Sequence, residues 1–210
     1  VGDLTTLEPF REGKLLVQDP AVRLVSLIAG VQPGQKVLDL CAAPGGKSFS
    51  AAFAMEDRGE ILACDLHENK LKRIQDGAQR LGLTSIRTAA ADGREFRPEW
   101  EAAFDTVLVD APCSGEGMFR KEPRMMADWE QQGPEYYSKL QREIILDAAD
   151  MLRPGGKLLY STCTFSELEN EGTIQYLLEQ RPDMKLIPCA PYEGFAKAVS
   201  YTHLRAHETS

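Results

Sequence analysis

The chain has 210 residues, of which 43% are hydrophobic and 27% charged, and its formal net charge is −8. This length and composition favour one globular domain with a buried core and indicate neither a membrane span, which needs ~20 apolar residues in a row, nor a secretion signal. The acidic balance excludes nucleic-acid binding through the overall field of the protein, so an RNA partner would need a local basic patch or a further domain.

Helices and strands alternate along the predicted fold. Asp19-Pro20 is typical of a helix N-cap, and the apolar residues that follow at helical spacing predict a short amphipathic helix ending at Gly30. Ser166 and Glu169 predict a capping box that opens a last helix, which reaches about Gln180. Buried strands are predicted at 36–42, 59–66, 86–92, 104–112 and 156–164, and further helices at 46–56, 68–81 and 135–152.

The predicted strands lack polar alternation and are separated by helices. This pattern predicts an α/β fold, a doubly wound and mostly parallel sheet covered on both faces. Ligands of such sheets bind at the carboxyl ends of the strands, near the point where the strand order reverses. Polar or reactive groups follow all five predicted strands, and they are Cys41–Lys47, Asp65, Asp92, Asp110–Gly115 and Cys163.

The glycine turn in "VLDLCAAPGGKS" (37–48) resembles a nucleotide loop at first sight. The phosphate-loop pattern needs a glycine where Cys41 stands, and the dinucleotide pattern fails as well. A nucleotide-hydrolysing protein, with "VLVDAP" (107–112) as its metal-binding strand, stays as an alternative weakened by this missing glycine. The backbone amides of such a turn can approach a carboxylate instead, which suits a nucleoside that carries an amino acid.

Two aspartates predict the rest of a nucleoside site. Asp65 follows the second strand, where a carboxylate can accept hydrogen bonds from both ribose hydroxyls, although an N-cap role is the alternative. Asp92 follows the third strand and could accept from an adenine amino group or only cap a turn. Together these positions imply an adenosine-bearing cofactor.

The five cysteines, at 41, 64, 113, 163 and 189, are scattered and include no C-x-x-C pair, which argues against a disulfide scaffold and a zinc site and favours free thiols in the cytoplasm. Cys64 and Cys189 are interpreted as small buried hydrophobes. Cys113 and Cys163 each follow a strand, where a thiolate could add to C6 of a cytosine and make C5 nucleophilic. A protonated carboxyl such as Asp110 could assist at N3.

Three motifs in order, "DLCAAPGGK" (39–47), "DAPCSG" (110–115) and "YSTCT" (160–164) with "ENE" (169–171), closely resemble the Sun-type RNA (cytosine-5)-methyltransferases. The resemblance covers about residues 10–198. It implies the Rossmann-like fold of class I S-adenosylmethionine-dependent methyltransferases, with S-adenosylmethionine as the cofactor and RNA as the partner. The substrate it implies is foremost 16S ribosomal RNA, with transfer RNA as the alternative.

The resemblance also implies a role for each matched residue. Cys163 would be the nucleophile and Cys113 would assist release, while Asp110 would face cofactor and base and Lys47 would reach the active site. The cofactor-binding residues it implies are Cys41, Ala42, Ala43, Pro44, Gly45, Gly46, Lys47, Asp65, Lys70, Asp92 and Asp110. The chain is expected to bind no metal and no membrane and to be a monomer in the cytoplasm. A non-catalytic RNA-binding assembly module with a relic cofactor pocket stays as an alternative.

The resemblance divides the chain into three segments. Residues 1–19 are expected to be a linker and the end of a missing N-terminal region, 20–198 the catalytic domain, and 199–210 a non-native or disordered tail. The final hairpin of the fold is expected to begin at "MKLIPC" (184–189) and to be truncated. Residues 59–87 resemble one branch of the family and 113–131 another, so the target cytosine stays open. Two basic clusters could contact RNA or form solvated faces, and they are Lys70, Lys72, Arg73 and Arg80, and Arg120, Lys121 and Arg124.

Overall fold

The computed structural model describes residues 3–95 and 97–188, which form two compact units. Of the described residues, unit 1 contains 3–95, 97–111 and 147–161, and unit 2 contains 112–146 and 162–188. In the part of the chain that is described, no helix is long and apolar enough to cross a membrane. The expectations for Cys189 and for the tail 199–210 lie outside the described residues.

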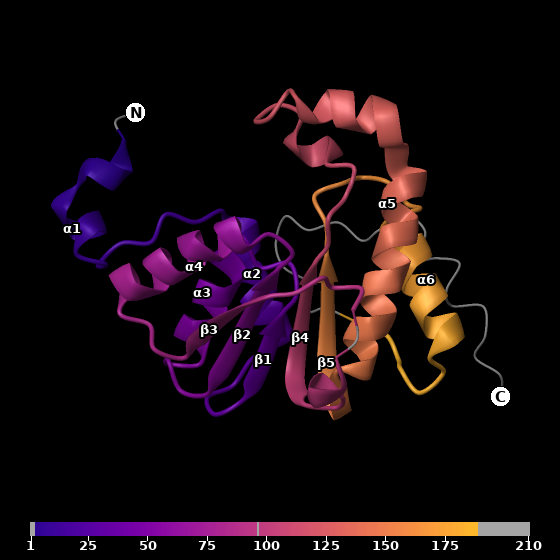
Figure 1. Ribbon diagram of the computed structural model, residues 1–210, viewed down its shortest axis with the longest axis horizontal. Coiled ribbons are helices and arrows are strands. Elements are labelled where there is room, and N and C mark those ends of the chain that lie inside the picture. Colours follow the sequence, from indigo (N-terminus) through magenta and orange to yellow (C-terminus); the bar gives the residue numbers. More distant parts are fainter. Residues whose placement is uncertain (1–2, 96, 189–210) are drawn as a thin grey trace. The chain divides into compact units, whose positions relative to one another are not determined.

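Helices and strands alternate as the sequence predicts (Figure 1). The helices are α1 (Glu8–Arg11), α2 (Pro20–Ala29), α3 (Gly46–Ala54), α4 (Glu68–Leu81), α5 (Met125–Asp150) and α6 (Glu171–Gln180). Short 3-10 turns lie at Leu4–Thr6, Pro98–Trp100 and Glu116–Met118. The strands are β1 (Lys36–Asp39), β2 (Glu60–Asp65), β3 (Ile86–Ala90), β4 (Phe104–Asp110) and β5 (Leu152–Ser161).

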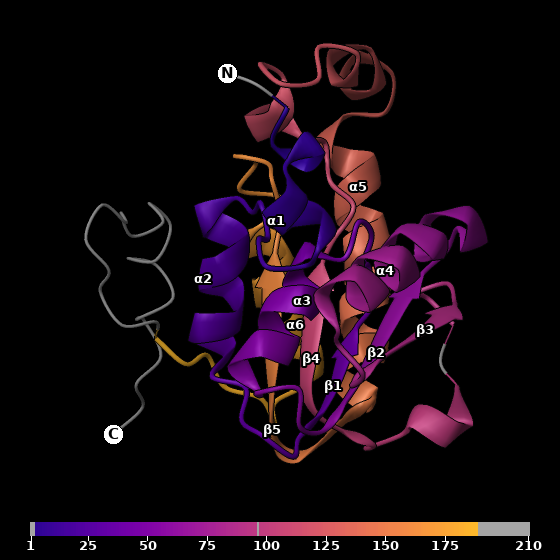
Figure 2. The ribbon, with the colours of Figure 1, turned by 90° about the vertical axis from the view of Figure 1, so that its left-hand side faces the viewer.

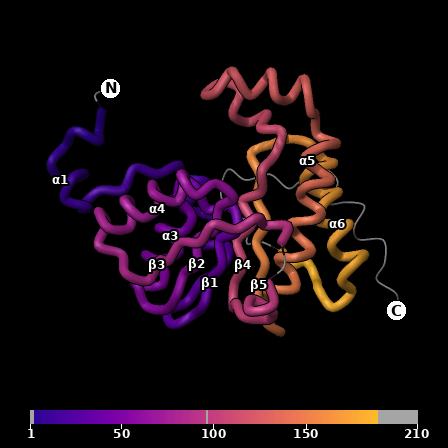
Figure 3. Tube along the Cα trace, in the orientation of Figure 1, coloured from indigo at the N-terminus to yellow at the C-terminus, as the bar shows by residue number. Residues whose placement is uncertain are grey.

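Unit 1 contains a five-stranded sheet in the order β3-β2-β1-β4-β5, with every neighbouring pair parallel. The strand order reverses between β1 and β4, which is the switch point of a Rossmann-like fold. The predicted α/β fold with a parallel sheet is therefore confirmed. Figure 2 shows α2, α3 and α4 in front of the strands, and Figure 3 traces the crossovers that return the chain from these three helices to the sheet.

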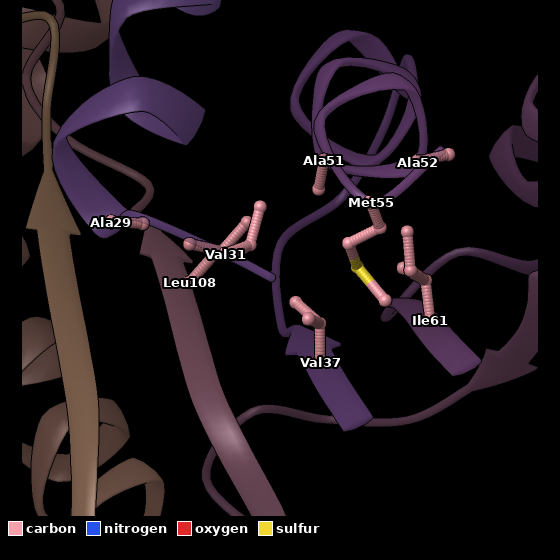
Figure 4. Packing of buried hydrophobic residues seen from close by; sticks show 8 residues of the cluster. All are labelled: Ala29, Val31, Val37, Ala51, Ala52, Met55, Ile61 and Leu108. Carbon is pink, nitrogen blue, oxygen red and sulfur yellow. The ribbon is translucent and has the colours of Figure 1, made fainter. Parts of the chain in front are cut away.

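The core of unit 1 lies between the sheet and the first helices. Small residues of α3 let this helix approach the sheet closely, and the side chain of Met55, fully buried, fills the space against Val37 and Ile61 (Figure 4). Along α4, Leu71, Ile74 and Ala78 are buried at helical spacing. This single apolar stripe explains why the predicted bounds of α4, residues 68–81, agree with the structure.

Local capping explains the observed bounds of α2, which agree with the predicted helix. Asp19 accepts a hydrogen bond from the Ala21 amide through Oδ1 at 3.0 Å, and Gly30 ends α2 in the left-handed conformation with φ 61°. A residue with a side chain is disfavoured at this φ, so the glycine sets the end of the helix.

Unit 2 departs from the predicted elements at α5. This helix begins at Met125 rather than at 135, and its first part is separated from the rest at Gly133, which has φ 66° and ψ 175°. Pro134 has no amide hydrogen and disfavours a helical conformation in the residue before it, which accounts for the break. Apolar periodicity alone revealed only the second part of the helix. In the described structure α6 runs alongside α5, with Thr173 Oγ1 3.4 Å from Gln141 Oε1 (Figure 1).

The predicted capping box is wrong. The helix α6 begins at Glu171, two residues after Glu169, and its N-cap residue Asn170 makes no side-chain cap hydrogen bond. The Glu169 side chain is instead fully buried and binds Ser114 and Gln141. Long-range hydrogen bonds therefore replace the local one, which a sequence pattern could not reveal.

The ends of the chain's last strand also differ from the prediction. β5 begins at Leu152, earlier than expected, because the Pro154-Gly155-Gly156 segment is accommodated in a shift of register against β4. It ends at Ser161, so Cys163 lies two residues beyond the strand. Residues 184–188, where the last hairpin was expected to begin, form no strand.

Candidate functional site

In unit 1, the glycine turn joins the carboxyl end of β1 to α3. Gly45 caps α3 with φ 106°, and a side chain there would place its Cβ 2.7 Å from the Phe49 ring. The Gly46 carbonyl accepts a hydrogen bond from Gln18 Nε2 at 2.7 Å. Gly45 is therefore required by its backbone conformation and by local packing, and the turn leaves the first amides of α3 without intrahelical partners.

An ion pair joins this turn to the end of β4. Lys47 Nζ lies 2.5 Å from Asp110 Oδ2, and the Lys47 side chain is only 12% exposed. Ser161, the last residue of β5, donates from Oγ to the other oxygen of Asp110 at 2.8 Å. Three strand ends thus contribute to one polar cluster. The expected role of Asp110 as an acid at N3 stays a prediction.

Asp39, in the same part of unit 1, is a residue to which the sequence reading gave no role. It is fully buried at the end of β1, and its Oδ2 accepts a hydrogen bond from Ser48 Oγ at 2.7 Å. Burial raises the Asp39 pKa to about 6, although the Ser48 hydrogen bond and the charge of Lys47 oppose the shift. Its place inside "DLCAAPGGK" was the only signal in the sequence.

Replacement of Asp39 by asparagine should remove a pH dependence of stability. The pKa of Asp39 is raised from 3.8 in the unfolded chain to about 6 in the folded protein. Protonated Asp39 therefore contributes its full stabilisation below about pH 4, and this stabilisation is lost as the pH rises through 6. The asparagine variant keeps an acceptor for Ser48 and does not ionise. Between pH 4 and 7 its unfolding free energy should therefore gain about 3 kcal/mol relative to wild type, measured by urea unfolding.

Asp57 provides a control, because its pKa is shifted in the opposite direction to that of Asp39. Burial opposes its ionisation, but hydrogen bonds from Ser85 and Thr84 outweigh burial and lower the Asp57 pKa to about 2. Its contribution to stability is present above pH 4 and is lost as the pH falls through 2, so Asp57→Asn should lose stability at neutral pH. Parallel pH profiles for Asp39→Asn and wild type would contradict the assignment to Asp39.

The two predicted nucleoside aspartates differ in what they offer a ligand. Asp65, 8% exposed at the end of β2, accepts from the His67 amide at 3.0 Å through Oδ1, which Lys70 Nζ approaches at 3.6 Å. Among the described residues no hydrogen bond reaches Asp65 Oδ2. Asp92, by contrast, is held through both oxygens by the Arg94 guanidinium, at 3.0 and 2.6 Å. Only Asp65 presents a carboxylate oxygen without a protein partner, and both ligand roles stay predictions.

In unit 2, the structure brings together the two cysteines singled out from the sequence. Their sulfur atoms lie 3.2 Å apart, and the Cys163 amide lies 3.3 Å from the Cys113 sulfur. Cys113 is 8% exposed, whereas Cys163 is exposed. The hydrogen bond with Cys163 and burial raise the pKa of the Cys113 thiol. Of the two, Cys163 is accessible to a large substrate, and Cys113 is held as a thiol beside it.

The remaining cysteines of unit 1 are not prepared for nucleophilic chemistry. Burial raises the pKa of Cys64 to about 12, and this residue is fully buried, which confirms its interpretation as a small hydrophobe. Burial also raises the pKa of the Cys41 thiol, followed by the charge of Asp39. Cys41 therefore contributes to the turn through its backbone rather than as a thiolate.

Some residues of the two basic clusters make hydrogen bonds or ion pairs within the protein. On α4, Arg80 donates to the carbonyls of Phe10 and Leu15, and Lys72 pairs with Asp76. In unit 2, Arg124 Nε lies 3.1 Å from Glu122. Arg80 therefore anchors the N-terminal segment to α4, and the reading of the α4 cluster as a patch for RNA loses this residue.

The nucleotide-hydrolysing alternative does not fit unit 1. Its loop lysine would have to reach a phosphate, yet Lys47 is paired with Asp110. Its loop serine would have to ligate a metal ion, yet Ser48 is fully buried and donates to Asp39. The residues present therefore argue against this reading.

Comparison with known proteins decides the family. The sequence profile described as 16S rRNA methyltransferase RsmB/F matches residues 26–207. The chain belongs to this family. The resemblance to the Sun-type enzymes is thus confirmed, and the parallel sheet of unit 1 agrees with the Rossmann-like fold that the resemblance implied.

Relatives of this RsmB/F chain include proteins named for ribosomal and for transfer RNA. The human tRNA (cytosine(72)-C(5))-methyltransferase NSUN6 is 40% identical over 195 residues, covering 86% of this chain and 40% of that protein. Ribosomal RNA small subunit methyltransferase F of Erwinia tasmaniensis is 40% identical over 187 residues, covering 87% and 39%. The crystal structure of NSun6 from Pyrococcus horikoshii with SFG has a TM-score of 0.83 at 30% identity, covering 94% of this chain and 50% of that one. The chain thus spans about two-fifths of the length of these curated relatives.

Proposed function

We propose that residues 20–198 are the catalytic segment of an RNA (cytosine-5)-methyltransferase that uses S-adenosylmethionine. The observation that carries this proposal is the pair of thiols in unit 2, one exposed and one buried, 3.2 Å apart. Family membership supports it, as do the names of the human and Erwinia relatives, which are RNA methyltransferases. A relic RNA-binding module would not need to keep two paired thiols.

The residues of unit 1 fit the cofactor. Asp65 Oδ2 is an acceptor for a ribose hydroxyl, and Lys70 stands beside the same carboxylate. The free amides at the start of α3 suit the carboxylate of the methionine part. SFG, the analogue of S-adenosylmethionine in the Pyrococcus structure, gives independent support. When bound, the cofactor supplies the methyl group that C5 of the cytosine accepts.

Cys163 would perform the covalent step. Its thiolate adds to C6 of the cytosine, so a carbon–sulfur bond forms and the electron pair of the C5–C6 double bond moves toward the ring carbonyl and N3, making C5 nucleophilic. After C5 has accepted the methyl group, a base removes the C5 proton. The double bond then reforms and the bond from C6 to sulfur breaks, releasing the Cys163 thiolate. Cys113, at 3.2 Å, is placed to assist this release.

Asp110 and Lys47 would act on the polar side of the base. Lys47 Nζ, 2.5 Å from Asp110 Oδ2, is the donor that this pair can offer to the base. We propose that the pair stabilises the charge that develops at N3 and O2 when the thiolate adds.

Methyl transfer to RNA tests the function directly. The full chain is incubated with S-adenosylmethionine and either small-subunit ribosomal RNA or transfer RNA, and bisulfite sequencing then locates new 5-methylcytosines. We expect methylated cytosines in at least one RNA and favour ribosomal RNA, because the family is described by that substrate. A chain that binds cofactor and RNA but leaves every cytosine unmodified would contradict the proposal. It would favour the alternative of a non-catalytic RNA-binding module with a relic cofactor pocket.

Cofactor binding should depend on Asp65. Replacement by alanine removes the acceptor for the ribose and should weaken the binding of S-adenosylhomocysteine by roughly 10-fold or more, the effect of losing charge-assisted hydrogen bonds. Titration calorimetry measures the change. Asp76→Ala serves as the control, because it removes an exposed carboxylate from α4, the helix that follows Asp65 in the chain. This variant should bind S-adenosylhomocysteine within twofold of wild type. Equal binding by both variants would remove Asp65 from the site.

A further inference from the structure

Two loops of unit 2 carry the thiols, and two carboxylates tie these loops together. The Pro-Cys loop is defined as residues 112–118 and contains Cys113, and the Thr-Cys loop is defined as residues 162–170 and contains Cys163. Neither loop has the regular backbone hydrogen bonds of a sheet. One backbone hydrogen bond joins them, from the Gly117 amide to the Cys163 carbonyl at 2.8 Å, and side-chain contacts supply the other connections near the two sulfur atoms, which lie 3.2 Å apart.

Glu169 reaches from the Thr-Cys loop into the Pro-Cys loop. Its Oε2 accepts from the Ser114 amide at 3.0 Å, and its Oε1 accepts from the Ser114 hydroxyl. The side chain is fully buried, and Gln141 of α5 donates to it from Nε2 at 2.8 Å. A buried carboxylate is costly unless hydrogen bonds compensate for the lost water, so this position is held in one geometry.

Glu116 makes the reciprocal connection from the Pro-Cys loop. Its Oε2 accepts from the Phe165 amide at 2.9 Å and from the Thr164 hydroxyl at 3.0 Å. Thr164 and Ser114 also meet through their hydroxyl oxygens at 2.9 Å. Each loop thus receives a carboxylate from the other, and the contacts fall on the residues that directly follow the two cysteines.

Gln141 completes the arrangement by fixing the start of the Pro-Cys loop. The same Nε2 that serves Glu169 lies 2.9 Å from the Pro112 carbonyl, the residue before Cys113. Cys113 is therefore held on both sides, by Gln141 through Pro112 and by Glu169 through Ser114. Cys163 is held through its own carbonyl, by the Gly117 amide, and through its following residue, Thr164.

We propose that Glu169 is a positioning residue, which holds Cys113 and Cys163 in register for the covalent step; this inference rests on the proposed function. Glu169 does not itself contact the base. Its removal should separate the thiols and so impair both adduct formation and release, while the cofactor site of unit 1 is unaffected.

The test measures thiol proximity and chemistry separately. Diamide, which takes up the two thiol hydrogens, forms a disulfide between Cys113 and Cys163 at a rate that reports their distance. Adduct formation with RNA that contains 5-fluorocytosine reports the covalent step. Glu169→Gln and Glu169→Ala are compared with Glu167→Gln, an exposed glutamate on the same loop, and calorimetry with S-adenosylhomocysteine confirms that each variant is folded.

We expect Glu169→Ala to slow both disulfide and adduct formation at least 10-fold, Glu169→Gln to keep part of each rate, and Glu167→Gln to match wild type within twofold. Cofactor affinity should stay within twofold in all three. A folded Glu169→Ala variant with wild-type rates in both assays would overturn the inference. If Glu169→Ala does not fold, Ser114→Ala decides, because it removes one donor to Glu169 and should slow both reactions at least threefold, whereas wild-type rates would overturn the inference.

The two assays also separate this inference from the proposed function. Absence of an adduct in wild type, with cofactor and RNA bound, contradicts the covalent mechanism. The disulfide rates then still show whether Glu169 holds the thiols together, and unchanged rates in the Glu169 variants reject that role.

Discussion

Replacement of Cys163 by serine should abolish the adduct with 5-fluorocytosine RNA and lower methyl transfer by roughly 10³-fold or more, because a serine hydroxyl stays protonated where a thiolate forms. Cys163 is the exposed member of the thiol pair, and deprotonation of Cys113 is disfavoured by its hydrogen bond with Cys163 and by burial. Gel shift under denaturing conditions detects the adduct, and transfer of a labelled methyl group measures the rate.

Cys113→Ser should behave differently from Cys163→Ser. It leaves the nucleophile in place but removes the group proposed to assist release, so the adduct should form with ordinary RNA and persist. Cys64→Ala, a change at a buried thiol of unit 1, should form adducts like wild type. An adduct that survives in Cys163→Ser and disappears in Cys113→Ser would assign the nucleophile to Cys113.

Replacement of Asp110 by asparagine should lower the methylation rate by about 10² to 10⁴, the range for a group that takes part in proton or charge stabilisation. The variant leaves Lys47, 12% exposed, beside a neutral amide instead of a carboxylate at 2.5 Å. The lysine then loses the charged partner that holds its position. Single-turnover rates at saturating RNA and cofactor isolate this effect from binding.

The matched control for Asp110 is an ion pair of the same composition in solvent. Lys72 and Asp76 lie 3.0 Å apart on α4 with side chains 76% and 60% exposed, so Asp76→Asn should change the rate less than twofold. Lys47→Met should reproduce most of the Asp110→Asn defect if the two act as a pair. An Asp110→Asn enzyme within threefold of wild type would show that the pair is structural only.

Much of the fold of unit 1 was predictable because its signals are local. The cap at Asp19, the left-handed Gly30 and the apolar stripe of α4 each depend on a few neighbouring residues, and each prediction agrees with the structure. Strand ends were less certain, since β5 begins and ends earlier than expected. A strand ends where its pairing partner ends, and pairing is not a local property.

The sequence by itself identified the candidate site residues: its motifs contain Lys47, Asp110 and the two cysteines proposed to react, near the ends of strands. Only the tertiary structure decided what each of them faces. Cys113 and Cys163 stand 50 residues apart in the chain, and their sulfur atoms meet beside the hydrogen bonds of Glu169, which a local pattern had suggested to be a helix cap. A buried carboxylate takes the partners that can replace its water, and folding brings those partners from distant segments.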